Sequence, residues 1–216
     1  MTDAELELNV TDELSWDPKI DSEEIAVSAD SGTVTLRGTV GSFRQKREAG
    51  KAAQRVYGVI AVDNDLDVRI LNDKRHEDAD LRGDILQALV LDGLVPSTID
   101  AKVKGGFVTL TGTADWQYQR DEAEFVAGNV AGVTGIEDDV YLTSPVPYPG
   151  DVKDSIKKAM NRDAKLDAES IGVDTMNGTA ILTGTVRSWA EHDSAVQAAW
   201  AAPGVTNVDD RLDIVY

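Results

Sequence analysis

The fold is decided by the stretch Ser-Gly-Thr-Val-Thr-Leu-Arg-Gly-Thr-Val at residues 31–40. Two later segments align with it without gaps, Gly-Gly-Phe-Val-Thr-Leu-Thr-Gly-Thr-Ala at 105–114 and Asn-Gly-Thr-Ala-Ile-Leu-Thr-Gly-Thr-Val at 177–186, at intervals of 74 and 72 residues. In each copy a third glycine, followed by valine, comes 20 residues after the second. These structural glycines are Gly32, Gly38, Gly58, Gly106, Gly112, Gly132, Gly178, Gly184 and Gly204. A fixed period predicts three copies of one module of about 65 residues.

The apolar spacing inside each copy predicts its elements. In the first copy Leu6, Val10 and Leu14 recur every fourth residue and form one stripe of a helix. Alternating runs on both sides of the first glycine predict a hairpin. A second helix with a narrow alanine face at residues 49–53 and a third strand after the glycine-valine pair complete the order. The sequence therefore predicts α+β modules of order α-β-β-α-β, each a three-stranded mixed sheet covered by two helices.

The expected modules span residues 1–70, 78–142 and 151–216. The linker at 71–77 is short and charged. The linker at 143–150 carries proline at every second position and is expected to be extended. Packing between the copies is expected to add stability, because a single module of this size is marginal alone.

The composition excludes several classes of protein. The 216 residues include 39 acidic and 21 basic side chains and no cysteine, and the net charge is −18. This charge disfavours nucleic acid as a partner, and the absence of cysteine excludes disulfides, thiol nucleophiles and iron–sulfur clusters. No apolar run approaches the roughly 20 residues of a membrane span, and the first residues do not resemble a signal peptide. We therefore expect a cytoplasmic protein, or a periplasmic one only if a leader was removed.

The repeated pattern resembles the BON domain family, named for bacterial osmotically inducible protein Y and nodulation proteins. The resemblance rests on the glycine-bounded hairpin, with Ala180 in place of valine in the third copy, the alanine-rich helix and the glycine-valine ending. It implies a non-enzymatic protein of the bacterial envelope or of stress responses. Membrane or phospholipid association, chaperoning of client proteins and, in a cytoplasmic branch, potassium binding are attributed to such proteins. The missing signal peptide departs from the periplasmic members.

No residue pattern indicates catalysis. His76 lies in a linker, and His192 has no histidine at the equivalent positions of the other copies. The glycine pairs do not form a phosphate-binding loop, since the pair at residues 105–106 precedes a strand. We therefore expect a protein that is not an enzyme and has no cofactor and no metal centre.

Two surface features are candidates for binding partners. The second helix of the first copy carries the basic residues Arg44, Arg47, Lys51 and Arg55, of which the last three recur every fourth residue. They form a solvated helix face, a dock for an acidic neighbouring copy, or a patch for anionic headgroups. Aromatic residues follow the second glycine of each copy, namely Phe43, Trp116, Tyr118 and Trp189. They serve as core or inter-module packing or, if exposed, as apolar anchors.

Acidic residues recur at the entry to each third strand. The candidate cation site comprises Asp63, Asp65, Glu137, Asp138, Asp139, Asp209 and Asp210. The segment at residues 63–74 is not an EF-hand, because its sixth position is Val68 and its twelfth is Lys74. These carboxylates either protect a sheet edge from aggregation or form a weak site for potassium or calcium.

Two functions follow from these features. The first is a stress-related binding protein that contacts membrane surfaces or client proteins. The alternative is a cytoplasmic cation sensor whose modules rearrange when a cation neutralises the acidic strand entries.

Overall fold

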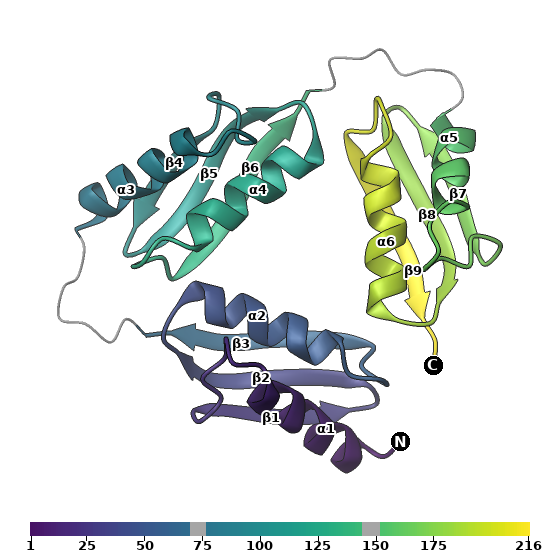
Figure 1. Cartoon of the computed structure of the whole chain (residues 1–216), viewed down its shortest axis with the longest axis horizontal. Helices are drawn as coiled ribbons and strands as arrows, with labels where there is room; N and C mark the ends of the chain where they lie inside the picture. The colour runs from purple at the N-terminus through teal and green to yellow at the C-terminus, as the bar shows by residue number, and fades with distance from the viewer. Residues whose placement is uncertain (70–76, 144–151) are drawn as a thin grey trace. The chain divides into compact units, whose positions relative to one another are not determined.

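A computed structural model describes residues 1–69, 77–143 and 152–216, and shows three modules of the same architecture (Figure 1). Module 1 contains α1 (Asp3–Trp16), β1 (Ile25–Asp30), β2 (Thr33–Val40), α2 (Phe43–Gln54) and β3 (Ala61–Val68). Module 2 contains α3 (Asp78–Leu91), β4 (Asp100–Lys104), β5 (Phe107–Ala114), α4 (Gln117–Gly128) and β6 (Gly135–Leu142). Module 3 contains α5 (Val152–Met160), β7 (Ile171–Met176), β8 (Thr179–Val186), α6 (Trp189–Trp200) and β9 (Asn207–Ile214). The linkers expected at 71–77 and 143–150 lie almost entirely outside the described residues.

Each module has one three-stranded sheet with the hairpin's second strand at its centre. In module 1 β1 pairs antiparallel with β2, and β2 pairs parallel with β3, so that Leu36 lies between Val27 and Asn64. Module 3 repeats this pairing with β7, β8 and β9. In module 2 β4 is antiparallel to β5, and β6 is the other neighbour of β5. The predicted α+β class, the order α-β-β-α-β and the mixed sheets are therefore confirmed.

The hairpins close through two-residue turns in which both residues have positive φ. The angles are 51° at Ser31 and 86° at Gly32 in module 1, and 50° at Asn177 and 81° at Gly178 in module 3. Two consecutive positive φ angles are typical of the type I′ turn, whose twist matches that of the flanking strands. Glycine adopts this conformation without a steric penalty, which explains why it recurs as the second turn residue.

The second glycine of each copy lies where two backbones approach closely. Gly112 has φ +126°, and a Cβ atom there would lie 2.2 Å from the carbonyl oxygen of Thr98. Gly38 and Gly184 have the same conformation and face the carbonyl oxygens of Glu24 and Ser170. A side chain at this position would clash with backbone that cannot move without breaking the hairpin.

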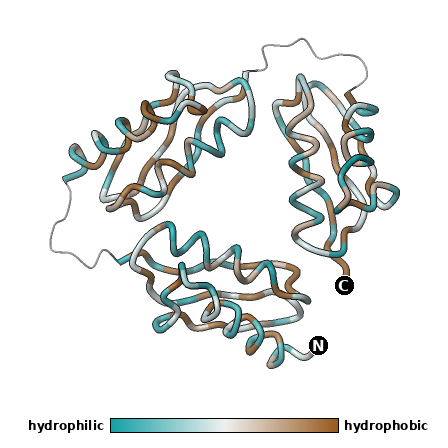
Figure 2. Tube along the Cα trace, in the orientation of Figure 1, coloured by the Kyte–Doolittle hydropathy of each residue, from teal (hydrophilic) through white to brown (hydrophobic). Residues whose placement is uncertain are grey.

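The core of each module lies between the sheet and its two helices, which cover the same face (Figure 1). The stripe predicted for the first helix is buried in all three modules, and the alanines of the second helix are buried against the sheet. In module 1 Leu36 at the centre of the sheet and Ala52 on α2 are both fully buried. Figure 2 shows the corresponding alternation of hydrophobic and hydrophilic residues along the chain trace. Small side chains let the second helix lie close to the strands.

Candidate functional site

The acidic residues of the third strands are divided between the two faces of each sheet. Successive side chains of a strand point to opposite faces. In β3 the exposed Asp63 and Asp65 alternate with the half-buried Asn64, which is on the helix-covered face. The seven residues expected to form a cation site therefore separate into two groups. On the open face lie Asp63, Asp65, Glu137, Asp139 and Asp209, and on the helix-covered face lie Asp138 and Asp210.

Two of the open-face carboxylates have basic neighbours. Arg37 Nε lies 3.7 Å from Asp65 Oδ2, and Arg211 Nε donates to Asp209 Oδ1 at 3.1 Å. The hydrogen bond from Arg211 lowers the pKa of Asp209 below its usual value. Across the described ranges 1–69, 77–143 and 152–216, no group of three or more histidine or carboxylate side chains is arranged to hold a metal ion.

The helix-covered residue of each third strand joins that strand to the second helix. We call this the helix–strand contact. In module 2 Arg120 Nε donates to Asp138 Oδ2 at 2.9 Å. In module 3 His192 Nε2 lies 2.7 Å from Asp210 Oδ2. In module 1 Asn64 Nδ2 donates to the carbonyl oxygen of Lys46 at 2.7 Å.

The three helix–strand contacts occupy equivalent positions, since the 74- and 72-residue intervals relate position 46 to 120 and 192, and 64 to 138 and 210. In each module the strand residue also accepts a hydrogen bond at Oδ1 from the backbone N–H two residues later. This second bond fixes the side chain, so that its other polar atom faces the helix. The same geometry is thus made with a neutral amide, an arginine–aspartate pair and a histidine–aspartate pair.

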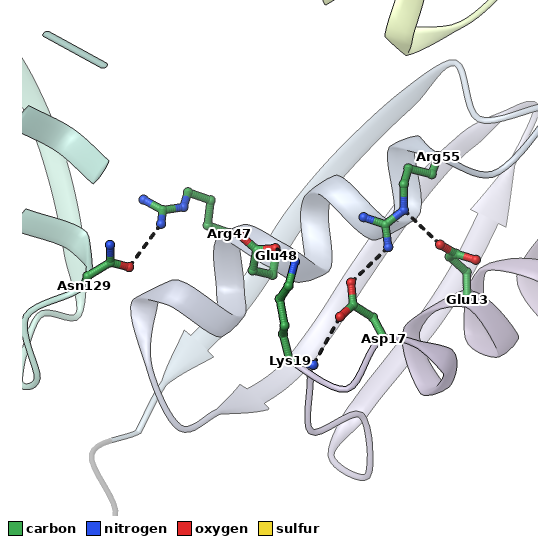
Figure 3. A network of polar contacts seen from close by, with 7 residues as sticks. All are labelled: Glu13, Asp17, Lys19, Arg47, Glu48, Arg55 and Asn129. Carbon is green, nitrogen blue, oxygen red and sulfur yellow. Dashed lines mark hydrogen bonds and ion pairs between the residues drawn. The ribbon is translucent and has the colours of Figure 1, made fainter. Parts of the chain in front are cut away.

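The basic stripe of α2 is partly engaged by carboxylates of its own module (Figure 3). Arg55, at the end of the helix, donates from Nε to Glu13 Oε1 at 2.9 Å and from Nη2 to Asp17 Oδ2 at 3.0 Å. A hydrogen bond from the backbone N–H of Lys19, and then Arg55, hold the pKa of Asp17 below its usual range. Lys19 Nζ in turn lies 3.0 Å from Glu48 Oε2. Arg55 therefore stabilises the packing of α1 on α2.

The other three basic residues of the stripe differ in exposure. Arg44 and Lys51 are exposed, and Arg47 is half-buried. Within the compact unit made of Met1–Gly112 and Arg120–Val140, Arg47 Nη2 donates to Asn129 Oδ1 at 3.3 Å (Figure 3). The stripe is therefore not a uniform cationic surface, because Arg55 and Arg47 already have partners.

The aromatic residues predicted near the second helices occupy different environments. Phe43 and Trp189 are the first residues of α2 and α6. Trp189 packs against the core of module 3, and its ring centroid lies 5.0 Å from that of His192. Trp116 directly precedes α4 and is half-buried, whereas Tyr118 inside α4 is exposed. These four residues therefore do not form one repeated exposed surface.

A further surface, which the sequence reasoning missed, lies at the ends of the first helices of modules 1 and 2. Trp16, the last residue of α1, is 83% exposed, and Val90 and Leu91 at the end of α3 are 80% and 77% exposed. Leu94 follows in the loop and is also exposed. We call these residues the apolar helix ends. The available signal was their position outside the stripe of every fourth residue, where a surface helix normally carries polar side chains.

Module 3 lacks this feature. The buried stripes of the first helices are 75 and 71 residues apart, so that Leu14 corresponds to Leu89 and Met160. Position 16 therefore corresponds to positions 91 and 162, and the third copy has the exposed Arg162 there. The apolar helix ends are therefore a property of two modules. In module 2 the exposed Val90, Leu91 and Leu94 are close in sequence, and a group of exposed large apolar side chains can mark a surface that contacts another molecule.

None of the helices in the described part of the chain is long and apolar enough to cross a bilayer. The fold defines a class of proteins built from tandem α+β modules. The chain matches the BON domain over residues 2–70, 77–143 and 150–216, and it belongs to this family.

The chain is also similar to one relative and to two solved structures. It is 34% identical to the osmotically inducible protein Y of Escherichia coli (strain K12) over 145 residues, which cover 65% of this chain and 72% of that protein. Two structures of CdsD, a structural protein of the type III secretion system of Chlamydia trachomatis, align with TM-scores of 0.28 and 0.27 at 15% and 13% identity. The first alignment covers 98% of this chain and 92% of the chain in that structure, and the second, to the C-terminal domain of CdsD, covers both chains fully.

Proposed function

We propose that this chain is a non-enzymatic binding protein of the osmotic stress response that contacts partly unfolded client proteins through its apolar helix ends. The single observation that carries the proposal is the exposure of Trp16 at the end of α1 and of Val90 and Leu91 at the end of α3. The relation to osmotically inducible protein Y supports the link to osmotic stress.

The charge of the chain favours proteins over anionic lipid surfaces as partners. The net charges are −5, −9 and −4 for residues 1–75, 76–147 and 148–216. Module 2 is therefore the most acidic of the three, and it also carries Val90, Leu91 and Leu94 of the apolar helix ends. An acidic surface repels anionic headgroups and attracts basic segments of an unfolded chain. Apolar contact then supplies the affinity, because burial of exposed apolar surface drives most associations.

Phospholipid contact would have to use the remaining cations of α2, chiefly Arg44 and Lys51. They are exposed, but Arg55 on the same helix is already bound to Glu13 and Asp17. Two or three cations contribute little near a surface, at about 1 kcal/mol each. We therefore place membrane contact second to client binding, as an outcome that the experiment distinguishes.

The experiment measures suppression of aggregation. The full chain is mixed with a basic test protein during heat denaturation at high osmolarity, and light scattering is recorded. A variant with Trp16→Ser, Val90→Ser and Leu91→Ser should lose most of the suppression, because it lacks the proposed apolar contact surface. It should still fold, because these exposed side chains contribute little to folding. The matched control is Met176→Ser, which removes an equally apolar side chain, 63% exposed on β7, from module 3.

Two results would contradict the proposal. The first is equal suppression by the triple variant and by the control. The second is flotation of the wild-type chain with vesicles of anionic phospholipid at low salt combined with no effect on the test protein, which would assign the function to the membrane. Circular dichroism melting of each variant checks that the fold is kept.

A further inference from the structure

We infer that His192 and Asp210 form a pH-sensitive contact between α6 and β9, which becomes tighter when the surroundings acidify from about pH 8 to pH 6, unlike the equivalent contacts of modules 1 and 2. The inference goes beyond partner binding and concerns regulation within one module. It rests on the comparison of the three helix–strand contacts, which are equivalent in position and differ in chemistry.

Both ring nitrogens of His192 face carboxylates. Nε2 lies 2.7 Å from Asp210 Oδ2, and Nδ1 lies 3.3 Å from Asp193 Oδ1. A neutral imidazole can donate from only one of its nitrogens, whereas the imidazolium donates from both. In the neutral form one carboxylate therefore faces a ring nitrogen without a proton. The geometry is satisfied fully only when the ring is protonated, and histidine changes charge between pH 5 and 8.

The other groups around His192 do not replace this role. Asp193 comes from α6 itself and Asp210 from β9, while Trp189 contacts the ring at its edge. Arg211, the basic residue next to Asp210, is bound to Asp209. The strands and helices on the covered side present apolar side chains to α6, namely Ala180, Leu182 and Val186 from β8 and Val152, Ile156 and Met160 from α5.

The sibling modules explain why the helix–strand contact responds to pH only in module 3. In module 2 the position of His192 is taken by Arg120, which stays charged throughout this pH range and keeps its bond to Asp138. In module 1 the bond from Asn64 to the Lys46 carbonyl involves no titratable group. The side chains of His192 and Asp210 are 14% and 34% exposed. Solvent therefore screens the pair only in part, while the ring can still exchange protons with water.

Amide hydrogen exchange of the full chain at pH 6 and pH 8 tests the inference. Protection of α6 and β9, corrected for intrinsic exchange rates and compared with α2 and β3, should be about two- to fivefold higher at pH 6. His192→Arg copies module 2, and Asp210→Asn copies the side chain of module 1. Both variants should fold, because their side chains already occupy the equivalent position in a sibling module, and both should lose the pH response.

The control is His76→Gln, which removes the other histidine of the chain and should leave the response intact. Equal relative protection of module 3 at the two pH values would overturn the inference. A response that persists in His192→Arg, or that disappears in His76→Gln, would also overturn it. If one of the two module 3 variants fails to fold, the other still decides the outcome.

Discussion

Modules 1 and 3 have the same hairpin, sheet register and alanine-faced second helix, yet they differ at two exposed or half-exposed positions. Module 1 ends its first helix with Trp16 and ties α2 to β3 through Asn64, whereas module 3 has Arg162 and the pair His192–Asp210 there. The shared positions are glycines and buried apolar residues, whose replacement would damage the fold. The differing positions can change without cost to the core. We infer that repetition preserved the framework while each module acquired its own surface chemistry.

Substitution of a glycine that the modules share should have the largest effect on stability. Gly112→Ala should destabilise module 2 by more than about 4 kcal/mol, because φ is +126° and the new Cβ would lie 2.2 Å from the Thr98 carbonyl oxygen. Calorimetry and exchange of the β4–β5 hairpin would measure it. The matched control is Gly83→Ala inside α3, where nothing lies within 4 Å of the new Cβ. That change should stabilise the module by up to about 1 kcal/mol. Similar effects of the two substitutions would show that close approach does not define the framework.

The helix–strand contact predicts a smaller effect. Arg120→Gln should cost module 2 about 1–2 kcal/mol, because Asp138 is left as a half-buried carboxylate without its cation. Arg37→Gln in module 1 is the control. Its guanidinium lies 3.7 Å from Asp65, both side chains are mostly exposed, and the loss should stay within about 0.5 kcal/mol. Thermal melts of both variants make the comparison. A larger loss for Arg37→Gln would mean that the open face, and not the helix–strand contact, stabilises these modules.

The smallest predicted effect concerns Glu124 of module 2. Burial, and then the charge of Asp138, raise the pKa of its carboxyl. The folded state therefore binds the proton more tightly than the unfolded chain, so this residue lowers stability at pH 7, and the penalty is lost as the pH falls through the raised pKa toward the ordinary value of 4.5. Glu124→Gln should raise the melting temperature at pH 7, and the gain in the free energy of unfolding should stay below about 1 kcal/mol. It should also reduce the gain in stability between pH 7 and pH 5, measured by melts across that range. A lower melting temperature at pH 7 would show that the ionised carboxylate stabilises the fold.

Most of the fold could be predicted from the sequence, because glycines at fixed offsets and apolar residues at fixed periods act through local geometry and burial. The surfaces were harder to predict. Alternation along a strand places Asp138 on a different face from Glu137 and Asp139, although the three are adjacent in sequence. Likewise, the pairing of Arg55 with Glu13 and Asp17 depends on how α1 packs on α2, which no local pattern of charges specifies.

Three apolar residues near the helix ends show the limit most clearly. Leu89 belongs to the buried stripe of α3, while its neighbours Val90 and Leu91 are exposed. Composition treats these residues alike, and only the rotation of 100° per residue along a helix separates them. Whether such side chains are covered depends on the packed module, so their role as a contact surface emerges only in three dimensions.

The central claim, that modules 1 and 2 contact partners through the apolar helix ends, is tested most directly by an exchange footprint. Amide exchange of the full chain is measured with and without a heat-denatured basic test protein. We predict new protection at the ends of α1 and α3, around Trp16 and around residues 90–95, and none at the equivalent end of α5. Protection confined to α2, or spread equally over the ends of all three first helices, would contradict the claim.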